Sequence, residues 1–221
     1  VTMLDPFSEQ NGKYNIAESS DGNYVVATSY KLFKVNSSSG DGISSSDWTD
    51  TWRKFMTNME PKNDGNIVYS STYKSTSMHN KIQIIDSSLS IISEYDNYLP
   101  LSGKYYSFGT YDSIDNTYIG VFVDSDQVYN NTYSVGDDKI YIKKIDLSDG
   151  SEVWSTDVTQ HRSMYRNDHE MPVNNFEVET NGSSQILVSF MVYSGVGYGP
   201  SDNHSNAGFI LLDSNGNILI P

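Results

Sequence analysis

Short apolar segments alternate with clusters of Gly, Asn, Asp and Ser along almost the whole chain. The segments are rich in Val, Ile, Phe and Tyr, and the three-four apolar spacing of an amphipathic helix is nearly absent. Apolar runs bounded by turn residues are typical of β-strands. The pattern therefore predicts an all-β protein, with strands at 23–29, 31–35, 66–73, 81–86, 117–123, 139–146, 185–193 and 208–213.

The predicted strands recur in a fixed order. A turn is followed by an apolar strand, a polar connection, a second apolar strand that ends near Asp, another turn and a short third strand. Copies of this order span 19–43, 63–95, 113–156 and 180–220, and 1–16 resembles the end of a preceding copy. The marker position after the second apolar strand is held in turn by Asp5, Asn36, Asp86, Asp146 and Asp213.

This repeat predicts the architecture. Repeats of four short strands are typical of propeller blades. The copies differ mainly in the connection between the two apolar strands, which grows to SDQVYNNTYSVGDD in the third copy. Insertions at one loop position map to one face of a propeller, which is often the binding face.

Two copies also resemble a known family. KIYIKKIDLSDGSEVWSTDV (139–158) is similar to a blade of quinoprotein-type (PQQ-like) β-propellers, and FILLDSNGNILI (209–220) is similar to the same hairpin. The resemblance implies that Asp146 and Gly150, like Asp213 and Gly216, set a tight turn, and that Trp154 packs between blades. The first two copies lack this Trp, and the second lacks the turn glycine. The residues that hold the quinone in that family are not located here, so this cofactor is not expected.

We expect a single domain over 1–221, a propeller-like array of four to five antiparallel blades. The alternatives are an arc cut from a larger propeller and a β-sandwich of two packed sheets. Because the sequence begins with Val1 and no apolar leader, we expect a processed product or a fragment of a larger extracellular protein.

Charge and composition narrow the partners. The chain carries 28 acidic and 14 basic residues, a net charge of -14, and no cysteine. An acidic surface repels phosphate backbones and anionic lipid, so nucleic-acid binding is not expected. No apolar run reaches the length of a membrane span, so membrane insertion is not expected either. Glycans, basic proteins and cations remain as partners, and an extracellular or cell-surface location fits this surface.

The stretch QHRSMYRNDHEMP (160–172) gathers candidate binding groups. It connects the third copy to the fourth, and such connections cross one face of a propeller near its channel. A carboxylate–histidine pair supports acid–base chemistry, and arginine binds carboxylate or sulfate. The alternative is a solvated connector with internally paired charges. No zinc site is expected, because no third ligand lies at a suitable sequence spacing from the two histidines. The candidates are His161, Tyr165, Arg166, Asp168 and His169.

Two further features carry candidate sites. Trp48 and Trp52 form either an exposed stacking platform for sugars or a buried contact between blades. The acidic clusters at 124–127 and 136–138 bracket the longest insertion, and their carboxylates are the oxygen ligands that calcium takes, although no EF-hand pattern is present. No cofactor other than calcium is expected.

Two functions follow from these features. The first is an extracellular, non-catalytic binding or structural module that holds a glycan, a protein partner or copies of itself. The alternative is a propeller enzyme that acts on a glycan or sulfated substrate through the 160–172 loop. The absence of a second convincing acid–base pair favours the first function.

Overall fold

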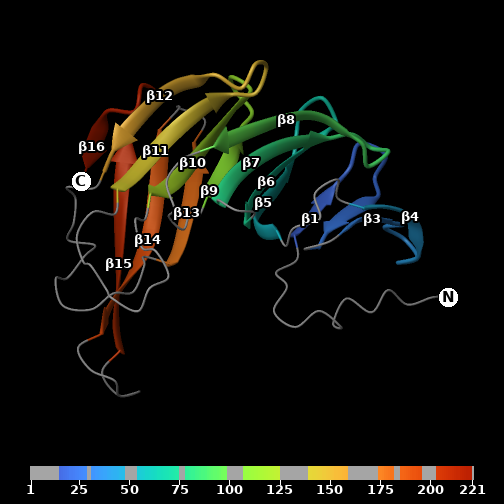
Figure 1. Ribbon diagram of the computed structural model, residues 1–221, viewed down its shortest axis with the longest axis horizontal. Coiled ribbons are helices and arrows are strands. Elements are labelled where there is room, and N and C mark those ends of the chain that lie inside the picture. Colours follow the sequence, from blue (N-terminus) through green and yellow to red (C-terminus); the bar gives the residue numbers. More distant parts are fainter. Residues whose placement is uncertain are drawn as a thin grey trace. The chain divides into compact units, whose positions relative to one another are not determined.

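The structure, a computed structural model, describes residues 15–28, 31–47, 54–74, 78–98, 107–124, 139–158, 174–181, 185–195 and 203–220. These residues form sixteen strands and no helix (Figure 1). The chain divides into two compact units, 1–100 and 101–221. Each unit holds two four-stranded antiparallel sheets, in which the strands are ordered as they follow along the chain. No described helix could span a membrane.

The first unit contains two blades. The first blade consists of β1 (Asn15–Glu18), β2 (Tyr24–Ala27), β3 (Lys31–Val35) and β4 (Gly42–Asp47). The second consists of β5 (Lys54–Pro61), β6 (Ile67–Lys74), β7 (Met78–Ile85) and β8 (Ile91–Tyr98). The first strands of the two blades, β1 and β5, lie next to each other.

The second unit repeats this arrangement. Its first blade, the third of the chain, consists of β9 (Ser107–Asp112), β10 (Thr117–Asp124), β11 (Lys139–Asp146) and β12 (Glu152–Asp157). The fourth blade consists of β13 (Asn174–Thr180), β14 (Ile186–Gly195), β15 (Asn203–Leu212) and β16 (Ile218–Ile220). Here β9 and β13 lie next to each other.

The all-β prediction and the four-stranded repeat are confirmed. The eight predicted apolar strands are the second and third strands of the four blades, and the short predicted strand is the fourth. The described residues form four separate sheets, not the two packed sheets of the sandwich alternative.

The marker residues hold the turn between the third and fourth strand of each described blade. Oδ1 of Asp213 accepts the backbone N–H groups two and four residues further on, each at 2.9 Å. Asp86 does the same at 2.8 and 2.9 Å, and Asp146 accepts the first of these groups at 2.7 Å. In the first blade the amide oxygen of Asn36 accepts the backbone N–H groups two and three residues further on, each at 2.9 Å. A side-chain oxygen that binds its own downstream backbone fixes the hairpin. Asp5 lies outside the described residues.

Each unit has its own apolar core between its two blades. In the first unit the core consists of Ala17, Val25, Ala27, Leu32, Met59, Ile67, Tyr69, Ile85 and Leu89. In the second it consists of Ile119, Val121, Ile142, Val158, Val178, Ile186, Val188, Ile210 and Leu212. Because side chains alternate between the two faces of a strand, each blade contributes only one of its two faces to the core of its unit.

Each outer strand carries a β-bulge at the same place. The register between the third and fourth strands shifts by one residue in every described blade. The extra residue on the outer strand is always an aliphatic side chain that is about half exposed, namely Ile43, Ile92, Val153 or Leu219. A bulge bends its strand and re-aims the side chains around it.

Candidate ligand-binding groove

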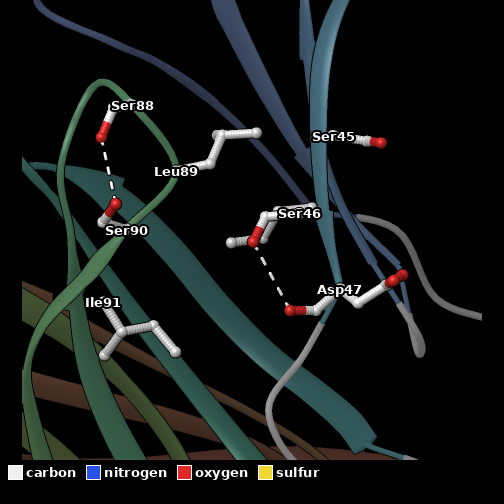
Figure 2. Close-up of a pocket in the computed structure, with 8 residues that line it drawn as sticks. Ser45, Ser46, Asp47, Ser88, Leu89, Ser90 and Ile91 are labelled. Atoms are coloured by element: carbon white, nitrogen blue, oxygen red, sulfur yellow. Dashed lines mark hydrogen bonds between the residues drawn. The ribbon is translucent and has the colours of Figure 1, made fainter.

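A groove in the first unit opens between the outer strand β4 and the β7–β8 turn (Figure 2). Its volume is about 370 Å³, which lies at the lower end of the range for small-molecule sites. Five polar and three apolar residues line it, namely Leu32, Ser45, Ser46, Asp47, Ser88, Leu89, Ser90 and Ile91.

The first wall of the groove is β4, whose central sequence is three consecutive serines, 44–46. Small side chains leave room beside this strand that a larger residue would fill. Ser46 points toward the opposite wall in Figure 2, and its hydroxyl donates to the carbonyl of Asp47 at 3.5 Å. The Asp47 carboxylate pairs with Lys31 at 2.8 Å and stays largely exposed. This wall therefore offers hydroxyl groups and one solvated carboxylate.

The second wall is the turn that Asp86 organises. The Ser88 hydroxyl donates to the Asp86 carboxylate at 2.7 Å and lies 3.1 Å from the Ser90 hydroxyl. Burial opposes ionisation of Asp86, but the hydrogen bonds from Ser88 and Ser90 outweigh it and hold the pKa of this carboxyl below its usual range. The turn is thus held rigidly by a charged acceptor and presents two hydroxyl groups.

Leu89 forms the floor between the two walls. It has a φ of 69°, a left-handed conformation that is uncommon for a residue with a branched side chain. The side chain is buried in the core of the first unit, and Figure 2 shows it directed from the turn toward β4. With Leu32 and Ile91 it supplies the apolar part of the lining. The cost of the left-handed backbone, about 1–2 kcal/mol, is offset by this burial.

A lysine ties the turn to the first blade. Nζ of Lys34 donates to the carbonyl oxygen of Ser87 at 2.5 Å and pairs with Asp21. The hydrogen bonds from Lys34 and then Ser19 hold the pKa of the Asp21 carboxyl well below its usual range. A buried cation on β3 therefore links the turn of the second wall to the first blade.

The second unit fills the corresponding space with its own side chains. Lys34 is paired in register with Ser44, and the equivalent Lys144 is paired with Trp154. The indole Nε1 of Trp154 donates to the carbonyl of Ser214 at 2.9 Å. On the same strand, the Thr156 hydroxyl donates to the carbonyl of Gly216 at 2.7 Å. The resemblance-based expectation that Trp154 packs between blades is confirmed, and so is the role of Gly150 and Gly216, which have positive φ in their turns.

The equivalent outer-strand residues Ser46 and Thr156 make different hydrogen bonds in the two units. Ser46 occupies the strand position of Thr156, because each is paired with the equivalent residue of its third strand, Leu32 or Ile142. Ser46 donates along its own strand, whereas Thr156 donates across to the neighbouring turn. The junction between the outer strand and the turn is thus closed by an indole in one unit and open to solvent in the other.

The candidate residues from the sequence analysis lie outside the described residues. This holds for the loop candidates His161, Tyr165, Arg166, Asp168 and His169 and for both tryptophans, Trp48 and Trp52. Trp48 follows directly in sequence on Asp47, the last residue of the groove wall β4. The acidic clusters proposed for calcium also lie outside, except the backbone of Asp124. The described residues contain no group of three potential metal ligands. The loop, the tryptophan platform, calcium binding and the enzyme alternative all stay predictions.

No protein-family model matches the chain. No curated protein matches it either.

Among solved structures, the chain is similar to hydrazine synthase from Kuenenia stuttgartiensis, with a TM-score of 0.57 and 15% sequence identity over 92% of this chain and 52% of that chain. Drosophila Plexin A in complex with Semaphorin 1b matches with a TM-score of 0.37 and 10% identity over 91% of this chain and 52% of that one. The extracellular domains 1–2 of Drosophila Semaphorin 1b match with a TM-score of 0.38 and 9% identity, over the same shares.

The chain thus spans about half the length of these three matched chains. At these identities the likeness concerns the fold alone. The fold class is all-β, a propeller-like array of antiparallel blades. The membership in quinoprotein-type propellers stays a prediction.

Proposed function

We propose that this chain is an extracellular, non-catalytic binding module, and that the groove of the first unit holds a neutral, hydroxyl-rich ligand such as one sugar ring of a glycan. The observation that carries this proposal is the open junction between β4 and the β7–β8 turn, which the second unit closes with the indole of Trp154.

The lining chemistry supports a sugar. A pyranose ring has hydroxyl groups at its rim and an apolar face of C–H groups. Serine hydroxyls and the Asp47 carboxylate would bind the rim, and Leu32, Leu89 and Ile91 would contact the apolar face. A neutral ligand is favoured over an anion, since the chain carries a net charge of -14. The acidic surface also supports the extracellular location.

The first experiment is a screen of the full chain against an array of neutral oligosaccharides, followed by calorimetric titration of the best ligand. The test variant is Ser46→Trp, which places an indole on the β4 wall of the groove. The matched control is Ser155→Trp, the same substitution at an exposed position on β12. We expect Ser46→Trp to weaken binding about tenfold or more and the control to leave it unchanged.

Two results would contradict the proposal. One is a screen in which no neutral oligosaccharide is retained by the wild-type chain. The other is a bound oligosaccharide whose affinity is the same for Ser46→Trp and for the wild type, which would place the site elsewhere.

A further inference from the structure

The two blades of each unit meet through two different faces. In the first unit the first blade contributes what we call the forward face, which includes Val25 and Leu32. The second blade contributes the opposite side of its sheet, the rear face, which includes Met59 and Ile67. In the second unit the third blade uses its forward face, with Ile119 and Ile142, against the rear face of the fourth, with Val178 and Ile186.

The strand registers show that these faces use the same positions in each blade. The second strand of the first, second and fourth blades begins with Tyr24, Ile67 and Ile186, respectively. Each of these residues pairs with the residue directly before the marker residue of its own blade. The first strand of the same blades contains Ile16, Met59 and Val178. Each pairs with the residue two positions beyond the start of the second strand. The strand registers therefore define equivalent positions in these three blades.

The rear face of the first blade is apolar and open. Ile16 is 61% exposed, whereas the equivalent Met59 and Val178 are 6% and 5% exposed. Tyr24 is 42% exposed, whereas the equivalent Ile67 and Ile186 are 0% and 1% exposed. Three further apolar residues lie on this face and are half-buried: Val26, Phe33 and Val35.

The forward face of the fourth blade is open in the same way. Leu187 is 40% exposed, whereas the equivalent Val25 is fully buried at 0%. Phe209 is 53% exposed, whereas the equivalent Leu32 is 1% exposed. Leu211 adds a half-buried leucine beside Phe209.

We propose that copies of this chain associate head to tail, with the forward face of the fourth blade of one copy packed on the rear face of the first blade of the next. The two open faces are the two halves of the interface that joins the blades within each unit, so a second copy supplies the surface that each face lacks. Contiguous exposed apolar surface of this kind marks an interaction site. Because the two faces differ, the contact is heterologous, and it builds rings or filaments.

Charge sets the conditions for this association. Each copy carries a net charge of -14, so copies repel one another at low ionic strength. Salt screens this repulsion, with a Debye length that falls to about 3 Å at 1 M, and leaves the apolar contact intact. Association should therefore strengthen as salt is added, whereas contacts made by ion pairs would weaken.

The test measures the mass of the full chain by sedimentation velocity over a range of protein and salt concentrations. Two variants each remove one face: Tyr24→Asp on the first blade and Phe209→Asp on the fourth. The matched control is Ile114→Asp, which changes an isoleucine in the β9–β10 turn that is 58% exposed. We expect the wild type and the control to associate increasingly with salt, and each face variant to associate about tenfold or more weakly.

Mixing the two face variants distinguishes head-to-tail contact from other modes. A Tyr24→Asp copy keeps its forward face and a Phe209→Asp copy keeps its rear face, so the mixture forms one intact junction and stops at a dimer. Circular dichroism of each variant shows that it is folded. The proposal is overturned by a wild type that stays monomeric under all conditions, or by face variants that do not form a dimer when mixed. The groove forms between β4 and the β7–β8 turn within the first unit, so neither result decides whether a ligand binds there.

Discussion

The indole ring of Trp154 lies directly against Gly216, with no space between them for a side chain. A Cβ built on Gly216 would lie 2.7 Å from Cε3 of the ring. In the first unit the sizes are exchanged: Leu89 holds the turn position of Gly216, and Ser44 holds the strand position of Trp154. The two units therefore carry their large residue on opposite sides of the corresponding junction.

This exchange predicts a compensating pair of mutations. Gly216→Leu should lower the free energy of unfolding by about 2–4 kcal/mol, because the side chain clashes with the indole and φ is positive. Adding Trp154→Ser, which copies the first unit, should recover part of this loss even though Trp154→Ser alone is destabilising. Urea denaturation of the two single variants and the double variant measures the coupling. Losses that simply add would show that the two residues do not compete for the same space.

A second prediction concerns the buried cation of the third blade. Lys144 pairs with Asp115 and lies 4.0 Å from the buried carboxylate of Asp112. Lys144→Met should cost about 3–5 kcal/mol, since it leaves Asp112 buried without its cation. The neighbouring Lys143 pairs with the exposed Glu152 at 2.8 Å, so Lys143→Met should cost less than about 1 kcal/mol. Equal losses in thermal or urea unfolding would contradict this reasoning.

The turn aspartates predict acid sensitivity. The Asn217 amide and two backbone N–H groups hold the pKa of the Asp213 carboxyl below its usual range. A pKa that is lower in the folded state adds stability above the unfolded-state pKa of about 3.9. This stability is lost as the pH falls further, through the folded-state pKa.

Asp213→Asn tests this acid sensitivity. The amide should keep the turn, as Asn36 does in the first blade. The variant should resemble the wild type near pH 7 and lose less stability below about pH 4. Urea midpoints measured against pH check this, and parallel curves for the two proteins would exclude a contribution from Asp213.

Leu89 provides a test in which two effects have opposite signs. Leu89→Gly removes the strain of a left-handed leucine, worth about 1–2 kcal/mol, but it also removes a buried side chain from the core, at a cost of about 2–5 kcal/mol. We expect net destabilisation, and a larger groove. Calorimetric unfolding gives the sign, and a more stable variant would mean that strain outweighs packing at this position.

Much of the fold could be predicted from the sequence because its determinants are local. The markers Asn36, Asp86, Asp146 and Asp213 bind backbone within their own turns, so their spacing shows the repeat directly. The alternating apolar strands before them are equally local. The sequence does not predict the first strand of each blade, since polar residues such as Glu177 and Glu179 interrupt its apolar pattern.

The groove and the open faces could not be predicted in this way. Both depend on which neighbour a position has in space. Tyr24 and Ile67 hold the same place in their blades, and only the presence of a packed neighbour makes one exposed and the other buried. Likewise, nothing in three serines of β4 indicates that they stand where another blade has a tryptophan.

The bulges of the outer strands bear on how this chain would aggregate. A straight edge strand is a template for further strands, and natural proteins use bulges to spoil it. Ile43, Ile92, Val153 and Leu219 each interrupt the regular pairing of an outer strand. Amyloid-like growth by edge addition is therefore disfavoured at every described blade, whereas the faces stay available for packing. Assemblies of this protein should lengthen by whole copies of the chain packed face to face, and they should not bind dyes that report cross-β structure.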